Sequence, residues 1–293
     1  MSDQPIIHQI QGARMTGSAA AVTLTADSWL DYVAFADARV RGDITGPTPI
    51  RECATDEDGE RADWRGTRTW GEALSQARDG SPAHLAQVGR ALDVLAATGT
   101  RARVPALVYD VAGETPDVAR FVAGDPCCMV TRRPSARTAR PIVRLLVHIG
   151  ARAEVTATQK INRGAAIVAL IDGLEDAGQR VEVTVCAAAK HYNKATYAMR
   201  ATVKRADEPS NRDVLAFALV SPAAQRRIDF ACRCAHSSKF DGMGSTCAAE
   251  PQPGEIYIPH AQENQPLDTP ARAAEYMRGV YEGAIEAMRD RAA

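Results

Sequence analysis

Three cysteines and one histidine lie close together in the last quarter of the sequence and could bind a zinc ion. Cys232, Cys234 and His236 are two positions apart from one another, and Cys247 follows after ten intervening residues. Zinc accepts thiolate and imidazole ligands in tetrahedral geometry. The spacing differs from the usual Cys-x₂-Cys pairs, and helical residues two apart point to different faces. The alternative is a set of free cysteines that pack as small hydrophobic groups, beside a surface histidine.

Five arginines in the middle of the chain could neutralise the phosphates of a nucleic acid. They are Arg132, Arg133, Arg137, Arg140 and Arg144. No aromatic residue suited to base stacking lies among them, which argues against recognition of single strands. A solvated connector is the alternative, as is pairing of these arginines with the acidic loop at residues 56–63.

No recognised nucleophile or phosphate-binding motif is present. The chain lacks a Gly-x-Ser-x-Gly elbow, a Gly-x₄-Gly-Lys-Ser/Thr loop and a Gly-x-Gly-x-x-Gly turn after a strand. Cys127 and Cys128 follow a predicted helix rather than precede one, so no helix dipole activates their thiols. We therefore predict no catalytic residues. A metal-dependent enzyme stays open as an alternative, and it would need Asp207, Glu208 or the cysteine cluster.

A predicted strand at residues 140–149, RPIVRLLVHI, ends in a loop that is poor in oxygen donors. Residues 148–152 carry neither a carboxylate nor a hydroxyl group, and the next such groups belong to Glu154 and Thr156. Hard cations such as Mg²⁺ take oxygen ligands from loops of this kind. We therefore expect this loop to lack a metal ion.

The elements that must position this loop form an α/β block at residues 140–207. An amphipathic helix at 161–180, closed by Gly178, follows the first strand, and strands at 181–189 and 197–207 come next. This order is typical of an open α/β sheet, in which ligands usually bind at the carboxyl ends of the strands.

The remainder divides into a mainly helical N-terminal region, 1–130, and an α/β domain that includes the block, 131–293. Residues 1–25 are predicted to be a polar lead-in with weak strand character near Val22. Four helices are predicted from their N-cap residues, which are Ser28, Thr69, Thr115 and Thr269.

Composition favours a folded protein that lies in the cytoplasm and does not contact a membrane. Hydrophobic residues make up 45% and charged residues 24% of the 293 positions, which is typical of a folded globular protein. A formal net charge of −1 argues against a protein that coats a polyanion such as nucleic acid. The N-terminus lacks the features of a signal peptide, and no stretch approaches the ~20 apolar residues of a membrane span. Seven cysteines, an odd number, favour reduced thiols over a disulfide framework.

Two resemblances extend this interpretation. The α/β block, above all GAAIVALIDGLEDAGQRVEV, resembles the opening of a von Willebrand factor A-like domain over about seventy residues. Metal-binding members place Asp-x-Ser-x-Ser where this chain has residues 148–152, so the resemblance implies a degenerate metal site. Three phrases resemble a family of proteins from tailed bacteriophages and prophages, over residues 64–290: WRGTRTWGEALSQARDG, YDVAGETPDVARFVAGDPCCM and INRGAAIVALIDGLEDAGQRVEV. This second resemblance implies a phage-encoded protein in a bacterial host, and it brings no catalytic residues.

We therefore predict a phage-encoded accessory protein that binds a phage or host protein and catalyses no reaction. A fold that usually carries a metal or catalytic site, but lacks the residues of that site, more often serves as an interaction module. Nucleic-acid binding through the five arginines is the alternative, and a metal-dependent enzyme is the second alternative.

Overall fold

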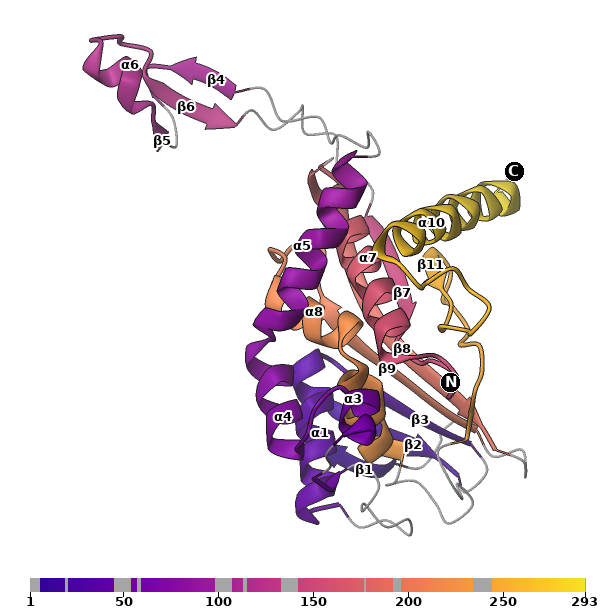
Figure 1. The fold of residues 1–293 in the computed structure, drawn as a ribbon. Coiled ribbons are helices and arrows are strands. Elements are labelled where there is room, and N and C mark those ends of the chain that lie inside the picture. The colour runs from indigo at the N-terminus through magenta and orange to yellow at the C-terminus, as the bar shows by residue number, and fades with distance from the viewer. Residues whose placement is uncertain are drawn as a thin grey trace.

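Eight strands drawn from both ends of the chain form one open, mixed sheet (Figure 1). The computed structural model describes residues 6–18, 21–44, 54–56, 59–97, 107–112, 115–132, 142–176, 178–191, 196–233 and 244–292. The strands of the sheet are β1 (Ile6–Ile10), β2 (Ala13–Gly17), β3 (Ala21–Ala26), β7 (Ile142–His148), β8 (Arg180–Lys190), β9 (Thr196–Lys204), β10 (Ser245–Thr246) and β11 (Glu255–Ile258). Their order is β1-β2-β3-β9-β8-β7-β11, with β10 paired to β8.

The centre of the sheet confirms the predicted α/β class. Strand β7 is parallel to both β8 and β11, β8 is antiparallel to β9, and β9 is parallel to β3. The predicted strand, helix, strand and strand of residues 140–207 all appear in the predicted order. Because β7 and β11 are parallel neighbours, their carboxyl ends meet at one edge of the sheet.

Helices cover one face of this sheet. They are α1 (Trp29–Arg41), α3 (Glu60–Arg65), α4 (Trp70–Asp79), α5 (Pro82–Ala97), α7 (Ala157–Asp176), α8 (Arg212–Val220), the π-helix η1 (Ala224–Asp229), α9 (Phe230–Arg233) and α10 (Pro270–Ala292). Helix α7 packs against α5, α8 and α10, whereas α1 packs on the strands at the N-terminal edge. The other face carries exposed polar side chains such as Arg14, Thr25 and Arg144, the alternation typical of a sheet with one solvated face.

Local sequence signals explain where several helices begin. The Ser28 side chain accepts a hydrogen bond from the Asp31 N–H, and that of Thr69 accepts one from the Glu72 N–H. The Thr269 hydroxyl accepts a hydrogen bond from the Arg272 N–H before Pro270 opens α10. These three predicted caps are confirmed. No helix among the described residues combines the length and the apolar character that crossing a membrane requires.

The N-terminal lead-in forms three strands, which is more than its weak strand signal predicted. In β3, Val22 and Leu24 are buried beside Tyr197 and Met199 of β9, with which they pair. The pairing with β9 stabilises these short strands. Because β9 is distant in the sequence, the local residue pattern does not reveal this partner. Strands from both sides of the predicted division at residues 130 and 131 therefore share one sheet.

Residues 107–112 and 115–132 form a separate small unit, which we name the hairpin module. It contains β4 (Leu107–Asp110), β5 (Thr115–Pro116), α6 (Val118–Val122) and β6 (Met129–Arg132), and it stands away from the main sheet in Figure 1. The predicted cap at Thr115 is wrong, because Thr115 and Pro116 pair with β6. Asp117 caps α6 instead, and its carboxylate accepts hydrogen bonds from two backbone N–H groups.

Candidate functional site

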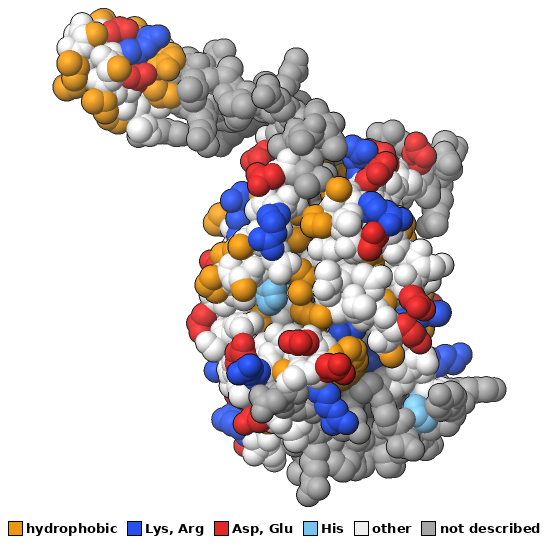
Figure 2. All heavy atoms as spheres, in the orientation of Figure 1, with side chains coloured by type: hydrophobic (Ala, Val, Ile, Leu, Met, Phe, Trp, Pro, Cys, Tyr) orange, Lys and Arg blue, Asp and Glu red, His pale blue; other side chains and the backbone are white. Residues whose placement is uncertain are grey.

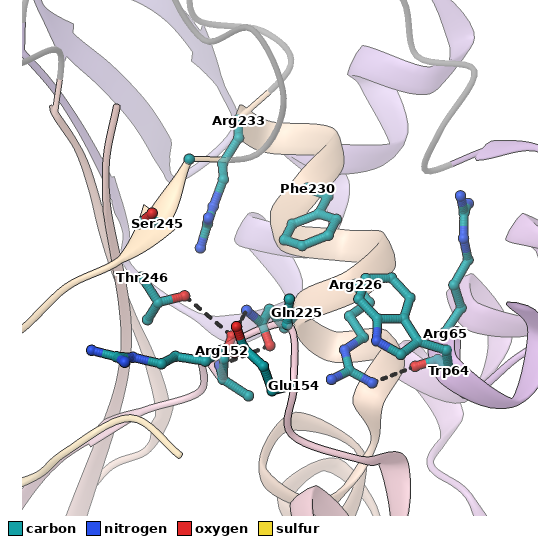
Figure 3. A pocket seen from close by; sticks show the side chains of 13 residues that line it. Trp64, Arg65, Arg152, Glu154, Gln225, Arg226, Phe230, Arg233, Ser245 and Thr246 are labelled. Carbon is teal, nitrogen blue, oxygen red and sulfur yellow. Dashed lines mark hydrogen bonds between the residues drawn. The ribbon is translucent and has the colours of Figure 1, made fainter. Parts of the chain in front are cut away.

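A cavity of about 500 Å³ lies at the carboxyl end of β7, where the loop that was predicted to be poor in oxygen donors begins (Figure 3). Four segments line it: the loop at residues 151–154, the helical segment η1–α9, the end of α3, and β10. Open α/β sheets usually bind ligands at this edge. We name this cavity the β7 pocket.

Arginines dominate the lining of the β7 pocket. Figure 3 shows Arg226 and Arg233 entering from one helical segment, with Phe230 between them. Trp64 and Arg65 come from α3 on one side, and β10 lies on the other side. The charged lining residues are Arg65, Arg152, Arg226, Arg233 and Glu154. Arg233 is paired with Asp229, which lies outside the lining, and the remaining lining charges still include more cations than carboxylates, which favours a positive potential in the pocket.

The π-helix η1 sets the position of the loop. A π-turn adds one residue to a helical turn and is frequent at functional sites. From η1, the Gln225 side chain accepts a hydrogen bond from the Ala151 N–H at 3.0 Å and donates one to the Ala151 carbonyl at 3.2 Å. The buried Lys160 donates from Nζ to Gln225 Oε1 at 2.9 Å and to the Ile149 carbonyl. The backbone of the loop is therefore held in place by side chains.

Three buried cations near the pocket bind carbonyl groups and have no carboxylate within 4.0 Å among the residues that the structure describes: Lys160, Arg163 and Arg226. Arg226 donates to the carbonyls of Trp64 at 2.6 Å and Val155 at 2.7 Å, and its guanidinium lies 4.1 Å from the Trp64 ring centroid. Arg163 donates to the carbonyls that follow or end β7 and β11, at His148 and Pro259.

Burial without a paired anion lowers the pKa values of these groups. Loss of solvation, reinforced by Arg226 and Arg163, holds the pKa of Lys160 well below its ordinary value. Loss of solvation also lowers the pKa values of Arg163 and Arg226 to about 10. The nearby Asp229 is already engaged, because it pairs with Arg233 at 2.6 Å and accepts hydrogen bonds from two tyrosine hydroxyls.

His148 ends β7, but its ring is committed to the fold. Nδ1 accepts a hydrogen bond from the Gly150 N–H at 2.9 Å, and Nε2 lies 3.0 Å from the Ala188 amide nitrogen. Burial lowers the pKa of the ring well below 6.5, with a further contribution from His260. With both nitrogens against the backbone, this imidazole has no free position for a metal ion or a substrate proton.

The structure describes two of the four residues of the predicted zinc site, Cys232 and Cys247. Cys232 is fully buried in the hydrophobic core and Cys247 is half-buried. Cys234 and His236 lie outside the described residues, so the zinc site stays a prediction. Within the described ranges, no three side chains of His, Cys, Asp or Glu form a group that could hold a metal ion. Four of the described cysteines are free thiols: Cys127, Cys128, Cys186 and Cys247.

The predicted arginine segment also falls mostly outside the described residues, which exclude Arg133, Arg137 and Arg140. Arg132 ends β6. Arg144 is exposed on the polar face of β7, and its guanidinium lies 3.4 Å from the Glu182 carboxylate. Nucleic-acid binding through these residues therefore remains a prediction.

The predicted acidic pair cannot complete a metal site at the β7 loop. Asp207 and Glu208 follow β9, which runs antiparallel to β8 and pairs its last residue, Lys204, with Val183 near the start of β8. The pair therefore lies at the opposite edge of the sheet from the carboxyl end of β7. Glu208 instead forms an exposed ion pair with Arg205.

The hairpin module presents a second candidate surface, and this surface is apolar. Among the residues whose exposure the structure describes, five large hydrophobic side chains are exposed, and four of them lie in the module: Val111, Val118, Phe121 and Val122. Val118, Phe121 and Val122 are three and four positions apart on α6, so they share one face. Figure 2 shows hydrophobic side chains gathered on this projecting unit.

Comparison with family models finds a match over most of the chain. A family model described as a domain of unknown function, DUF7192, matches residues 14–283. No curated protein and no solved structure matches the chain. The matched range contains the main sheet from β2 onward, the β7 pocket and the hairpin module.

Proposed function

We propose that this chain, which belongs to the DUF7192 family, is a non-catalytic protein that binds a protein partner through the apolar face of α6. The observation that carries this proposal is the exposure of Val118, Phe121 and Val122, which is 70%, 67% and 79% respectively. Contiguous exposed apolar side chains mark interaction sites on folded proteins.

Polar contacts inside the hairpin module support this role, because they hold its shape while the apolar side chains point outward. The Asp117 N–H donates to the Cys128 carbonyl at 2.8 Å. The Arg120 guanidinium lies 3.7 Å from the centroid of the Tyr109 ring and 3.2 Å from the Asp125 carboxylate. A module that is shaped in this way presents a preformed apolar face, which reduces the entropy cost of binding.

The β7 loop supports the absence of catalysis. Backbone groups occupy both ring nitrogens of His148, and Lys160 is committed to Gln225 and the Ile149 carbonyl. The strand, helix, strand and strand order of β7, α7, β8 and β9 supports the proposal of a von Willebrand factor A-like scaffold.

The three sequence phrases support a phage origin, with a phage or host protein as the partner in a bacterial cytoplasm. The second phrase, at residues 109–129, is the core of the hairpin module. The surface proposed to bind a partner thus lies in the segment that carries the resemblance.

The test is quantitative capture of a partner by a double variant, Phe121→Ser with Val122→Ser. The full chain is cross-linked in the cells that naturally express it, and co-purified proteins are counted by mass spectrometry. Burial of an apolar side chain of this size stabilises an interface by roughly 1.5–3 kcal/mol. We therefore expect at least about tenfold less of the partner with the double variant.

The matched control is Leu30→Ser, because Leu30 on α1 is an exposed large hydrophobic residue outside the module. Its capture of the partner should equal that of the wild type. Equal capture by the double variant, or equal loss with Leu30→Ser, would contradict a role for the α6 face.

A further inference from the structure

We propose that the β7 pocket binds a phosphorylated small molecule of nucleotide size, with its phosphate oxygens against Arg152, Arg226 and Arg233. This ligand site is independent of the protein-binding surface proposed on α6.

Unpaired positive charge is the first reason to expect an anion. Arg226 is 1% exposed and touches two carbonyls, but no described carboxylate lies within 4.0 Å of its nitrogens. Lys160, which contacts the lining residue Gln225, and Arg163, which contacts the His148 carbonyl at the end of β7, are buried in the same condition. Burial of a cation is costly unless an anion compensates it. A bound anion beside Arg226 would supply the charge that this buried cation lacks.

The low pKa values of these cations agree with this account. Arg226 and Arg163 are among the groups that depress the pKa of Lys160, so the three groups feel one another's charge. An anion placed between the loop and η1 would oppose that mutual repulsion. The geometry of the pocket places Arg152 and Arg233 on the same cavity from the loop and from α9.

The balance of charges favours phosphate over carboxylate. Arg152 and Arg226 on the lining, and the buried Lys160 and Arg163 near it, have no carboxylate within 4.0 Å among the described residues, whereas Arg233 is paired with Asp229. Glu154 is the acidic residue of the lining, so a single carboxylate ligand leaves much of this positive charge uncompensated. A phosphate monoester carries about −1.5 to −2 at neutral pH and offers three acceptor oxygens. Planar guanidinium groups match phosphate oxygens in pairs, which makes arginine a preferred partner.

The size and walls of the pocket indicate an organic group beside the phosphate. A cavity of about 500 Å³ is far larger than inorganic phosphate and lies in the usual range of small-molecule sites. Trp64 and Phe230 line it together, with ring centroids 6.4 Å apart. The free surface of these rings can contact a planar or apolar part of the ligand.

Isothermal titration of the full chain with pyrophosphate and with ATP, both without added metal, tests this proposal. Succinate and a hexaglutamate peptide serve as carboxylate probes. Arg152 is the informative position because it is exposed and its removal leaves the hydrogen bonds of Arg226 intact. We expect Arg152→Ala to weaken the binding of both phosphate probes about tenfold, because it removes a charge-assisted hydrogen bond. Arg144→Ala, an exposed arginine on β7 outside the pocket, should bind them like the wild type.

Each other outcome overturns the proposal. If neither pyrophosphate nor ATP binds at millimolar concentration, the site is rejected. If Arg152→Ala binds these probes as tightly as the wild type does, the location of the site is rejected. Equal or tighter binding of succinate or the peptide rejects phosphate as the ligand chemistry. The double variant of α6 should retain ATP binding, so failure of this site is distinguishable from failure of the protein-binding proposal.

Discussion

At the scale of single residues, buried histidine ties the stability of the fold to pH. Burial lowers the pKa of His148 well below 6.5, so the unfolded chain takes up a proton in a range where the folded chain does not. The free energy of unfolding should therefore fall as the pH drops from 7.5 through 6.5 toward the lowered pKa. Urea denaturation at pH 7.5 and pH 5.5 measures this loss.

The variant His148→Gln isolates the contribution of this side chain. Its amide does not titrate, so the loss of stability between the two pH values should be smaller than in the wild type. His84 and His260 have lowered pKa values too, so the variant should still lose some stability as the pH falls. An unchanged pH dependence in His148→Gln would show that the titrating group lies elsewhere.

The residues that line the β7 pocket were the least predictable part of the molecule. The loop at 148–152 was singled out for its lack of oxygen donors, but the cations around it were not expected. Lys160, Arg163 and Arg226 are separated in sequence, and lysine and arginine are almost never fully buried unless they are paired. One signal was present: Arg226 and Arg227 lie among the apolar residues Ala223, Ala224, Ile228 and Phe230 after Pro222.

At the scale of elements, the contact between α7 and α8 depends on one glycine. A Cβ atom at Gly164 would lie 2.5 Å from the Cα of Val220 and closer still to the Leu219 carbonyl oxygen. Both contacts are with backbone, which cannot move without separating the two helices. Gly164→Ala should therefore destabilise the fold by about 1–3 kcal/mol, as measured by chemical denaturation.

Gly173 supplies the control in the same helix. It is exposed, and a Cβ atom there would meet no other atom within 4 Å. Gly173→Ala should stabilise the chain by roughly 0.5–1 kcal/mol, because alanine loses less backbone entropy in a helix. A similar effect from both substitutions would contradict the close approach of α7 and α8.

Elements with strong local signals were predictable, and those that depend on distant partners were not. The caps at Ser28, Thr69 and Thr269 are local hydrogen bonds, and the sequence contains both partners within a few positions. Strands β1 and β2 are short, and they form a sheet through β3 and its remote neighbour β9. Side-chain patterning within residues 1–25 therefore understated their strand content.

At the scale of the whole molecule, the hairpin module is an insertion between α5 and β7. Among the described elements, the strands of the module pack closely against one another, β4 with β6 and β5 with β6. Replacement of residues 107–132 by a short Gly-Ser linker should therefore change the free energy of unfolding of the remaining body by less than ~1 kcal/mol.

Circular dichroism and urea denaturation of the shortened chain measure this change, and ATP titration shows whether the β7 pocket persists. Loss of cooperative unfolding would mean that the main sheet needs the module. Retained capture of the partner would place the interaction surface on the body instead.

The parallel pairing of β3 with β9 has a consequence for biosynthesis. A nascent chain exposes β3 as an unsatisfied edge until the ribosome has released Thr196 and the residues beyond it. Exposed edges of this kind are templates for aggregation, and contacts between distant segments slow folding. The first twenty-six residues must therefore wait for most of the polypeptide, a delay during which a holding chaperone would protect the emerging chain.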